Sequence, residues 1–231
     1  MLQPEHLKVF AQCPLFSGID PGDYEFLLSC INSYTKAYRT GEFILLPGDQ
    51  TNHVGVVLSG SVEISKENPA GAKHILHFLG PSGLFGEGIV CTSHRISPVA
   101  VRVKEPSLIL FIPYQRIIVS CGNSCGFHIR LIENMMTILG EKNMGLTEKI
   151  ELLMLKGMRE KLAAFLLGEF QKTGSTTFRI LPNRNELAEY LNVSRPSMSR
   201  ELARMKEEGL IDYYQNSFRI LKLEELKKSL Q

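Results

Sequence analysis

At residues 182–206 the chain reads PNRNELAEYLNVSRPSMSRELARMK, and its capping and turn residues predict two short helices joined by a tight turn. Asn183 can cap the first helix, and Glu186, three residues later, completes a capping box. Asn192 tolerates the left-handed backbone that a sharp turn requires, and Ser194 can cap the second helix. The stretch therefore predicts a helix-turn-helix.

The second helix of this motif has a polar face that can read DNA. Met198, Leu202 and Met205 recur at helical spacing and are expected to face the core. The candidate DNA-binding residues on the other faces and at the cap are Ser194, Arg195, Ser197, Ser199, Arg200 and Arg204. Arginine can donate two hydrogen bonds to guanine, so Arg195 and Arg200 are the candidate base readers. A surface hairpin with solvated arginines is the alternative, but the conjunction of caps, turn and arginines favours DNA binding.

The residues that follow predict a wing beside this motif. Gly209 ends the second helix, and residues 212–221 have the pattern of a short β-hairpin. Residues 155–231 contain 14 Lys and Arg against 10 Asp and Glu, so the modest basic surplus of the chain lies in this part. The segment is therefore predicted to be a winged helix-turn-helix.

The composition is typical of a globular protein, and its 231 residues are enough for two domains. Apolar runs such as residues 108–113 are far shorter than the roughly 18 residues of a membrane helix, and the N-terminus lacks a signal-peptide pattern. We therefore expect a cytoplasmic protein with no membrane partner. The five cysteines are odd in number and scattered, which argues against a disulfide framework.

The region 34–113 has the pattern of an all-β domain, preceded by helices expected at 4–12 and 21–31. Short apolar runs alternate with glycine- and proline-containing turns. The expected strands are 43–46, 54–58, 61–65, 74–78, 99–103 and 108–112. Such spacing predicts a small antiparallel barrel or roll, whose interior commonly holds a ligand.

From residue 126 to 153 the pattern changes to that of a helix with a heptad repeat. Its seam alternates spacings of four and three and comprises Ile132, Met136, Leu139, Asn143, Leu146, Ile150 and Leu153. The one polar member, Asn143, is a residue type that fixes the register of paired helices. The alternative is a helix that lies against its own roll; the length of the seam favours a homodimer.

These elements give an α+β fold in three parts. We expect an antiparallel β-roll at 1–125 that senses an effector, a dimerisation helix at 126–154, and the winged helix-turn-helix at 155–231. A further helix at 158–170 and a linker at 172–177 connect the dimerisation helix to the reader.

Four motifs give the whole chain a resemblance to the CRP/FNR family of bacterial transcription regulators. They are LFSGI at 15–19, LSGSV at 58–62, LFGE at 84–87 and LNVSR at 191–195. The resemblance implies a cyclic-nucleotide-binding-like roll, a dimerisation helix and a winged helix, and the regulation of transcription as an activator or a repressor. It also implies double-stranded DNA with an inverted repeat as the partner, with RNA polymerase as a further candidate.

The resemblance also carries expectations about the pocket. In relatives that bind cyclic nucleotides, a Gly-Glu pair holds the ribose, and an Arg-Ser or Arg-Thr pair about ten residues later holds the phosphate. Here the Gly-Glu pair is present, but Ser97-Pro98 occupies the phosphate position and Arg95 lies two residues early. An arginine fork is difficult to replace at a buried phosphate, so we expect an effector other than cyclic AMP. The candidate effector-binding residues are Gly86, Glu87, Arg95, Ser97, Leu146 and Thr147.

At one position the reader differs from family members that read a TGTGA-like half-site. In members that read a TGTGA-like half-site, a glutamate follows the first arginine and accepts a hydrogen bond from a cytosine. Here that position is Pro196, which offers no acceptor. The resemblance therefore implies that one half-site position is relaxed or read differently.

Other functions remain as alternatives. The roll could be a scaffold of an effector-independent DNA-binding protein, or Cys121 and Cys125, with His128, could form a thiol or metal redox sensor. Three ligands without a fourth are a weak metal signal, so we expect no metal site and no cofactor beyond the unidentified effector. Nucleophile elbows, phosphate-binding loops and metalloprotease motifs are absent from the sequence, and we expect no enzymatic activity and no catalytic residues.

Overall fold

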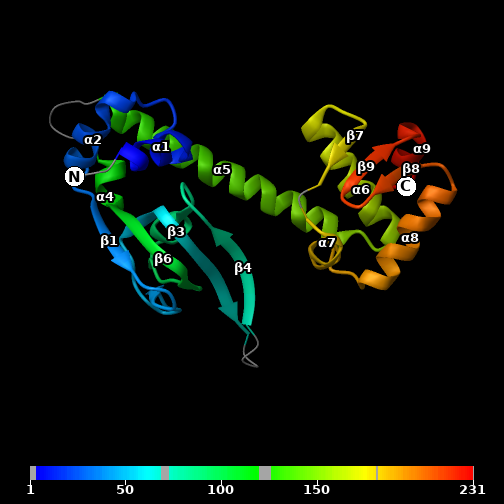
Figure 1. Ribbon diagram of the computed structural model, residues 1–231, viewed down its shortest axis with the longest axis horizontal. Coiled ribbons are helices and arrows are strands. Elements are labelled where there is room, and N and C mark those ends of the chain that lie inside the picture. The colour runs from blue at the N-terminus through cyan, green and yellow to red at the C-terminus, as the bar shows by residue number, and fades with distance from the viewer. Residues whose placement is uncertain (1–3, 69–72, 120–125, 181, 231) are drawn as a thin grey trace. The chain divides into compact units, whose positions relative to one another are not determined.

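A computed structural model describes residues 4–68, 73–119, 126–180 and 182–230, and it divides into two compact units, 1–142 and 143–231 (Figure 1). The first unit is an antiparallel roll with helices beside it, and the second is a helical unit with a small sheet. The architecture is α+β, as the sequence predicts. Among the described residues, no helix is both long enough and apolar enough to cross a membrane.

The first unit begins with four helical segments and continues into the roll. The segments are α1 (Pro4–Gln12), η1 (Pro14–Phe16), η2 (Pro21–Asp23) and α2 (Tyr24–Cys30). The strands and short helices that follow are β1 (Tyr34–Tyr38), β2 (Phe43–Leu45), β3 (His53–Glu67), β4 (Lys73–Leu79), β5 (Leu84–Phe85), α3 (Glu87–Val90), β6 (Ala100–Pro113) and α4 (Tyr114–Ile118).

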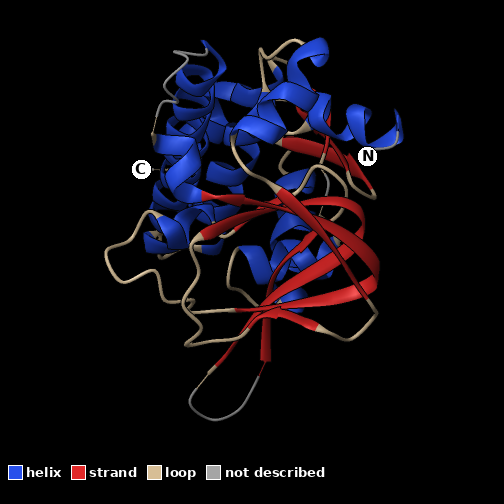
Figure 2. Cartoon of the chain, turned by 90° about the vertical axis from the view of Figure 1, so that its left-hand side faces the viewer, coloured by secondary structure: helices blue, strands red, loops and turns tan. Residues whose placement is uncertain are grey.

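The strands form one antiparallel sheet that curls into the roll (Figure 2). The order is β1-β6-β3-β4, with β2 on β6 and β5 on β3. The long strands β3 and β6 each join two strands that the sequence predicted as separate. Gly60, which lies between the expected strands 54–58 and 61–65, is at an irregularity inside β3, where its φ of +79° bends the strand without ending it. Strand β1 was not predicted, because its side chains are mostly exposed and give no apolar alternation.

Successive residues of the sheet pack into different cores. Val56 contacts the cluster that includes the helices α1 and α2, whereas its neighbour Val57 belongs to the interior of the roll with Ile109 and Phe111. This division follows from the alternation of side chains along a strand. The N-terminal part of α5 (Gly126–Met154) closes the outer core with Leu131, Met135 and Ile138.

The second unit contains the rest of the chain. Its elements after α5 are α6 (Met158–Thr173), β7 (Thr177–Arg179), α7 (Arg184–Tyr190), α8 (Arg195–Glu207), β8 (Ile211–Tyr214), β9 (Ser217–Ile220) and α9 (Leu223–Lys228). The predicted wing is the hairpin β8–β9. Strand β7, which was not predicted, is the third strand of this sheet, and its first residue was assigned to the linker. Buried Leu162, Leu166, Leu202 and Phe218 share one core, which fixes α8 against α6 and the wing.

Candidate DNA-binding site and effector pocket

The two helices of the reader begin where the sequence predicts. Asn183 Oδ1 accepts hydrogen bonds from the backbone N–H groups of Asn185 and Glu186, at 2.9 and 3.1 Å. The Glu186 carboxylate accepts the N–H of Asn183 at 2.7 Å, which completes the capping box. Asn192 turns the chain at a φ of +50°, and Ser194 caps α8 by accepting the N–H of Ser197. Local sequence therefore fixes the turn between α7 and α8.

Helix α8 buries one face and exposes the other. Met198, Leu202 and Met205 are buried, whereas Arg195, Ser199 and Arg200 are exposed. Four of the six predicted residues, the exposed Arg200 among them, have partners inside the unit. The Ser194 and Ser197 hydroxyls lie 2.8 Å apart. Ser197 Oγ also accepts from Arg200 at 3.3 Å, and Arg204 lies 3.6 Å from Glu201.

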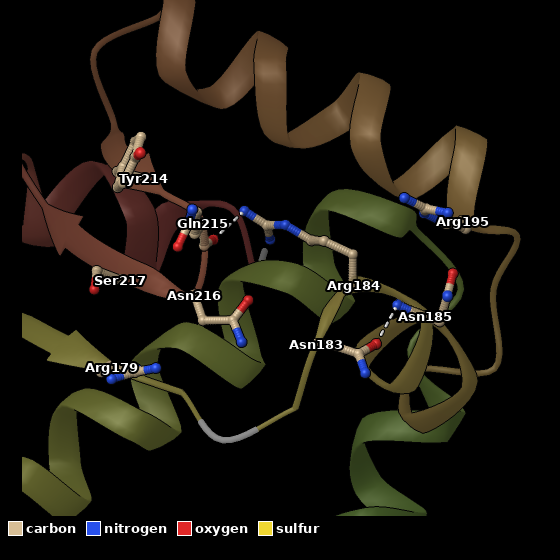
Figure 3. A pocket seen from close by; sticks show the side chains of 9 residues that line it. All are labelled: Arg179, Asn183, Arg184, Asn185, Arg195, Tyr214, Gln215, Asn216 and Ser217. Atoms are coloured by element: carbon tan, nitrogen blue, oxygen red, sulfur yellow. Dashed lines mark hydrogen bonds between the residues drawn. The ribbon is translucent and has the colours of Figure 1, made fainter.

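A polar groove borders the start of α8 (Figure 3). It has a volume of about 650 Å³. Its lining comes from β7, the start of α7, the wing and the first residue of α8: Arg179, Asn183, Arg184, Asn185, Arg195, Tyr214, Gln215, Asn216 and Ser217. The described lining includes three arginines and no acidic side chain, so the groove suits an anionic ligand. Of these residues, only Arg195 was selected from sequence as a DNA contact.

Arg184, one of the residues that line this groove, connects α7 to the wing. Its guanidinium lies 4.8 Å from the ring centroids of both Tyr213 and Phe218, and it donates to the Gln215 carbonyl at 2.9 Å. Burial lowers the pKa of Arg184. This role could not be predicted from local sequence, because Arg184 and Gln215 of the wing are 31 residues apart.

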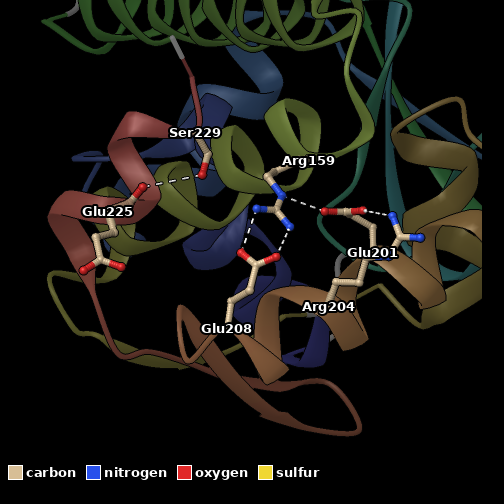
Figure 4. A network of polar contacts seen from close by, with 6 residues as sticks. All are labelled: Arg159, Glu201, Arg204, Glu208, Glu225 and Ser229. Carbon is tan, nitrogen blue, oxygen red and sulfur yellow. Dashed lines mark hydrogen bonds and ion pairs between the residues drawn. The ribbon is translucent and has the colours of Figure 1, made fainter.

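An ion-pair network fixes the other end of α8 to α6 (Figure 4). Arg159 of α6 donates to Glu201 at 2.7 Å and, with its two terminal nitrogens, to both oxygens of Glu208 at 2.7 and 2.6 Å. The hydrogen bonds to Glu208 and Glu201 raise the pKa of Arg159, and those from Arg159 lower the pKa of Glu208. Bidentate pairing restricts orientation as well as distance, so α8 is oriented at both ends.

The predicted dimer seam is largely uncovered in the single chain. The exposed fractions of Met136, Leu146 and Ile150 are 66%, 64% and 58%. Ile129, which the sequence analysis did not include, is 63% exposed and precedes Ile132 by three residues in the same repeat. Leu139 and Ile132 are half-buried, and Asn143 is exposed. Exposed apolar side chains therefore recur along this face of α5.

The pocket motif places a buried carboxylate at the start of α3. Gly86 has a φ of +84°, and a Cβ there would lie 3.0 Å from the His53 carbonyl oxygen, so glycine is favoured twice over. Glu87 is 6% exposed. One of its oxygens pairs with the ammonium of Lys142 on α5, and the other has no hydrogen-bond partner among the described residues.

The remaining predicted effector contacts have partners of their own. Ser97 is buried and its hydroxyl donates to the Val99 carbonyl at 2.8 Å. Arg95 donates to the Asn52 side chain at 2.8 Å and lies 5.2 Å from the Tyr114 ring centroid. Leu146 and Thr147 belong to the second unit, where Leu146 is exposed and the Thr147 hydroxyl donates to the Asn143 carbonyl.

The cysteine constellation is described only in part. Cys121 and Cys125 lie outside the described residues. His128 is buried, and its Nε2 lies 3.9 Å from the sulfur of Cys30 at the end of α2. Within the described ranges, three or more potential metal ligands do not gather at any point.

Two family models match the chain over the regions just described. The cyclic nucleotide-binding domain matches residues 35–119, and the Crp-like helix-turn-helix domain matches residues 160–229. The chain belongs to the CRP/FNR family. Members of this family are DNA-binding transcription regulators rather than enzymes.

Curated CRP/FNR relatives extend this match to most of the chain. The cyclic AMP receptor protein of Thermus thermophilus is 26% identical over 198 residues, which is 86% of this chain and 88% of the relative. The transcriptional activator protein Anr of Pseudomonas protegens is 27% identical over 183 residues, or 76% and 72% of the two chains. The relatives therefore include regulators with different names.

Solved structures show the same fold. A mutant of CooA from Carboxydothermus hydrogenoformans aligns with a TM-score of 0.59 at 22% identity, covering 88% of this chain and 90% of the other. The catabolite activator protein of Thermus thermophilus aligns with a TM-score of 0.53 at 23% identity, covering 94% and 98%.

Proposed function

We propose that the protein is a homodimeric transcription regulator that reads an inverted-repeat operator with Arg195 and Arg200 and responds to an effector other than cyclic AMP. The observation that carries the DNA-reading part is the exposed arginine face of α8 beside a groove lined by three arginines. Arginines on the first turns of a recognition helix are suited to the acceptors of guanine in the major groove.

The groove favours an arrangement in which different residues contact the DNA bases and the phosphate backbone. Arg179 and Asn185 are exposed, lie in the groove, and come from different elements than α8. Arg184 is committed to the wing aromatics and to Gln215. We therefore assign phosphate contacts to Arg179 and Asn185, and a positioning role to Arg184.

Dimerisation is supported by the exposed seam on α5. Exposure of Met136, Leu146 and Ile150 to water is unfavourable for an isolated chain. Pairing with a second copy would cover them, and a twofold dimer would place two readers on half-sites about 34–36 Å apart, one turn of DNA.

The effector part of the proposal rests on the residue that the pocket motif lacks and on the contacts that its polar groups already make. The phosphate-holding arginine of cyclic-nucleotide-binding relatives is replaced by Ser97-Pro98, and the Ser97 hydroxyl is used by Val99. Glu87 retains an unpartnered oxygen in the described structure, which a hydrogen-bond donor on an effector could satisfy.

A randomised-operator selection with the purified full-length protein tests the proposal. We expect an inverted repeat with a guanine in each half-site, and a relaxed position opposite Pro196. Repeating the selection with cell extract shows whether an effector is needed. Recovery of sequences without twofold symmetry, or without any preference, would contradict the proposal.

A further inference from the structure

A lysine of α5 contacts the end of the first reader helix. Lys149 donates from its ammonium to the main-chain carbonyl of Tyr190, the last residue of α7, and its nitrogen lies 3.2 Å from the Tyr190 ring centroid. The ring of Tyr190 is held in turn by Phe165 of α6, with centroids 5.7 Å apart. The contact is thus made to both the backbone and the side chain of the same residue.

A second lysine reaches the next carbonyl. Lys161 of α6 is 9% exposed, and its ammonium donates to the carbonyl of Leu191, the C-cap of α7, at 3.2 Å. The last carbonyls of a helix have no partners within it and carry partial negative charge, so two cations there are favourable. Burial, and to a lesser extent Lys161, lowers the pKa of Lys149. The two ammonium groups therefore contact the carbonyls of consecutive residues, Tyr190 and Leu191, at the same helix end.

The end of α7 determines where α8 begins. Only Asn192, Val193 and Ser194 separate the C-cap Leu191 from the first residue of α8, and the Val193 N–H bonds back to the Ala188 carbonyl at 2.9 Å. A shift of the α7 end is therefore transmitted directly to the recognition helix.

Lys149 also immediately precedes a residue of the dimer seam. Its neighbour Ile150 is 58% exposed on the face predicted to pair with a second copy. Pairing of two helices fixes the rotation of each about its own axis. That rotation sets the direction in which Lys149 points.

We propose that Lys149 is a positioning residue through which the paired α5 helices set the orientation of α7, and hence of α8, for specific DNA binding. The inference rests on the proposed dimeric, DNA-reading function. It adds a physical connection between the dimer interface and the reader helices. Lys149 contacts no DNA in this account and acts only through α7.

The test compares Lys149→Met, Lys149→Arg and Lys172→Met in the full-length protein, by operator affinity in fluorescence anisotropy. Methionine keeps most of the aliphatic stem and removes the donor. Lys172 is the matched control, because it is a lysine of α6 that pairs with Glu148 of α5 and with Glu169. We expect Lys149→Met to weaken specific binding about tenfold, a loss of one good charged hydrogen bond. Lys149→Arg should recover most of that loss, and Lys172→Met should change affinity less than twofold.

Two readouts separate positioning from simple loss of stability. Leu226→Ala destabilises the same unit at a buried site on α9. If it weakens specific binding as much as Lys149→Met, after correction for the folded fraction, the inference is overturned. The salt dependence of binding should be unchanged in Lys149→Met, because no phosphate contact is removed. A shallower salt slope would place Lys149 on the DNA and would also contradict the proposal.

Failure of this inference is distinguishable from failure of the proposed function. Wild-type protein that is monomeric in sedimentation, or that binds no operator, would contradict the proposed function. A dimeric wild type that binds its operator, together with a Lys149→Met variant of unchanged specific affinity, would contradict only the role of Lys149.

Discussion

The reader and the pocket motif differ in how far their polar side chains are committed to the chain itself. In the reader, backbone contacts are supplied by Asn183, Glu186 and Ser194, which leaves Arg195 and Arg200 exposed. In the pocket motif, Glu87 is paired with Lys142 and Ser97 with Val99. The two candidate base readers take no part in capping the helices and stay accessible to an external partner. Glu87 and Ser97, in contrast, are already used in contacts within the chain.

The largest expected effect concerns the surface that makes two readers act together. Replacing Leu139 and Leu146 by glutamate should give monomers and abolish specific DNA binding, because like charges would face each other across the seam. Sedimentation and operator binding measure the two outcomes. Replacement of Glu141 by lysine, an exposed change on α5 off the seam, is the control and should leave the dimer intact. A double variant that remains dimeric would show that the seam is not the interface.

The next prediction tests whether the exposed arginines read bases. Arg200→Ala should cost about 1–3 kcal/mol of operator affinity and flatten one position in each half-site. Arg179→Ala, in the groove, should instead weaken all sequences alike and reduce the salt slope by about 1. Lys228→Ala on the exposed side of α9 is the control. If Arg200→Ala leaves the selected sequences unchanged, base reading lies elsewhere.

A third prediction uses a buried carboxylate of the roll that belongs to neither motif. Glu63 is 2% exposed and pairs with Lys73 and with Lys104, the latter at 3.5 Å. The hydrogen bond from Lys73 is the main reason that the pKa of Glu63 is lowered from 4.5. A lowered folded-state pKa means that this stabilisation is present above pH 4.5 and is lost as the pH falls through the folded value.

Glu63→Gln should therefore remove part of the acid sensitivity of the roll. The chain has no tryptophan, so circular dichroism during denaturant unfolding between about pH 3 and 7 is the appropriate measurement. We expect the variant to be less stable than wild type at pH 7, with the difference shrinking toward acid. A difference that is constant across the whole range would disprove the assignment of this pH dependence to Glu63.

The smallest expected effect is the response to cyclic AMP. A ligand at 100 times its dissociation constant adds about 2.7 kcal/mol of stability. We expect saturating cyclic AMP to leave the melting temperature unchanged, because the phosphate-holding arginine is absent. Glu87→Gln is a second arm, which should change the response to the true effector once one is found. Sub-micromolar binding of cyclic AMP in calorimetry would contradict this prediction. It would also show that the internal contacts of the pocket residues do not prevent binding of an external ligand.

The sequence by itself determined the features that depend on near neighbours in the chain. The caps at Asn183 and Ser194, the left-handed turn at Asn192 and the apolar heptad repeat of α5 involve residues a few positions apart, so their spacing alone identifies them. Local spacing also predicted the antiparallel roll. It predicted each of the long strands β3 and β6 as two shorter strands, because a bulge and a turn contain similar residues.

Only the tertiary structure decided which distant residues meet. Arg184 under the wing, Arg159 on Glu208 and Lys149 on Tyr190 join residues separated by 31, 49 and 41 positions. The pairing of Glu87 with Lys142 spans 55 positions. A charged side chain in a sequence is compatible with solvent, DNA or a distant partner. Which of these it contacts depends on the packing that brings the elements together, and no local spacing encodes that choice.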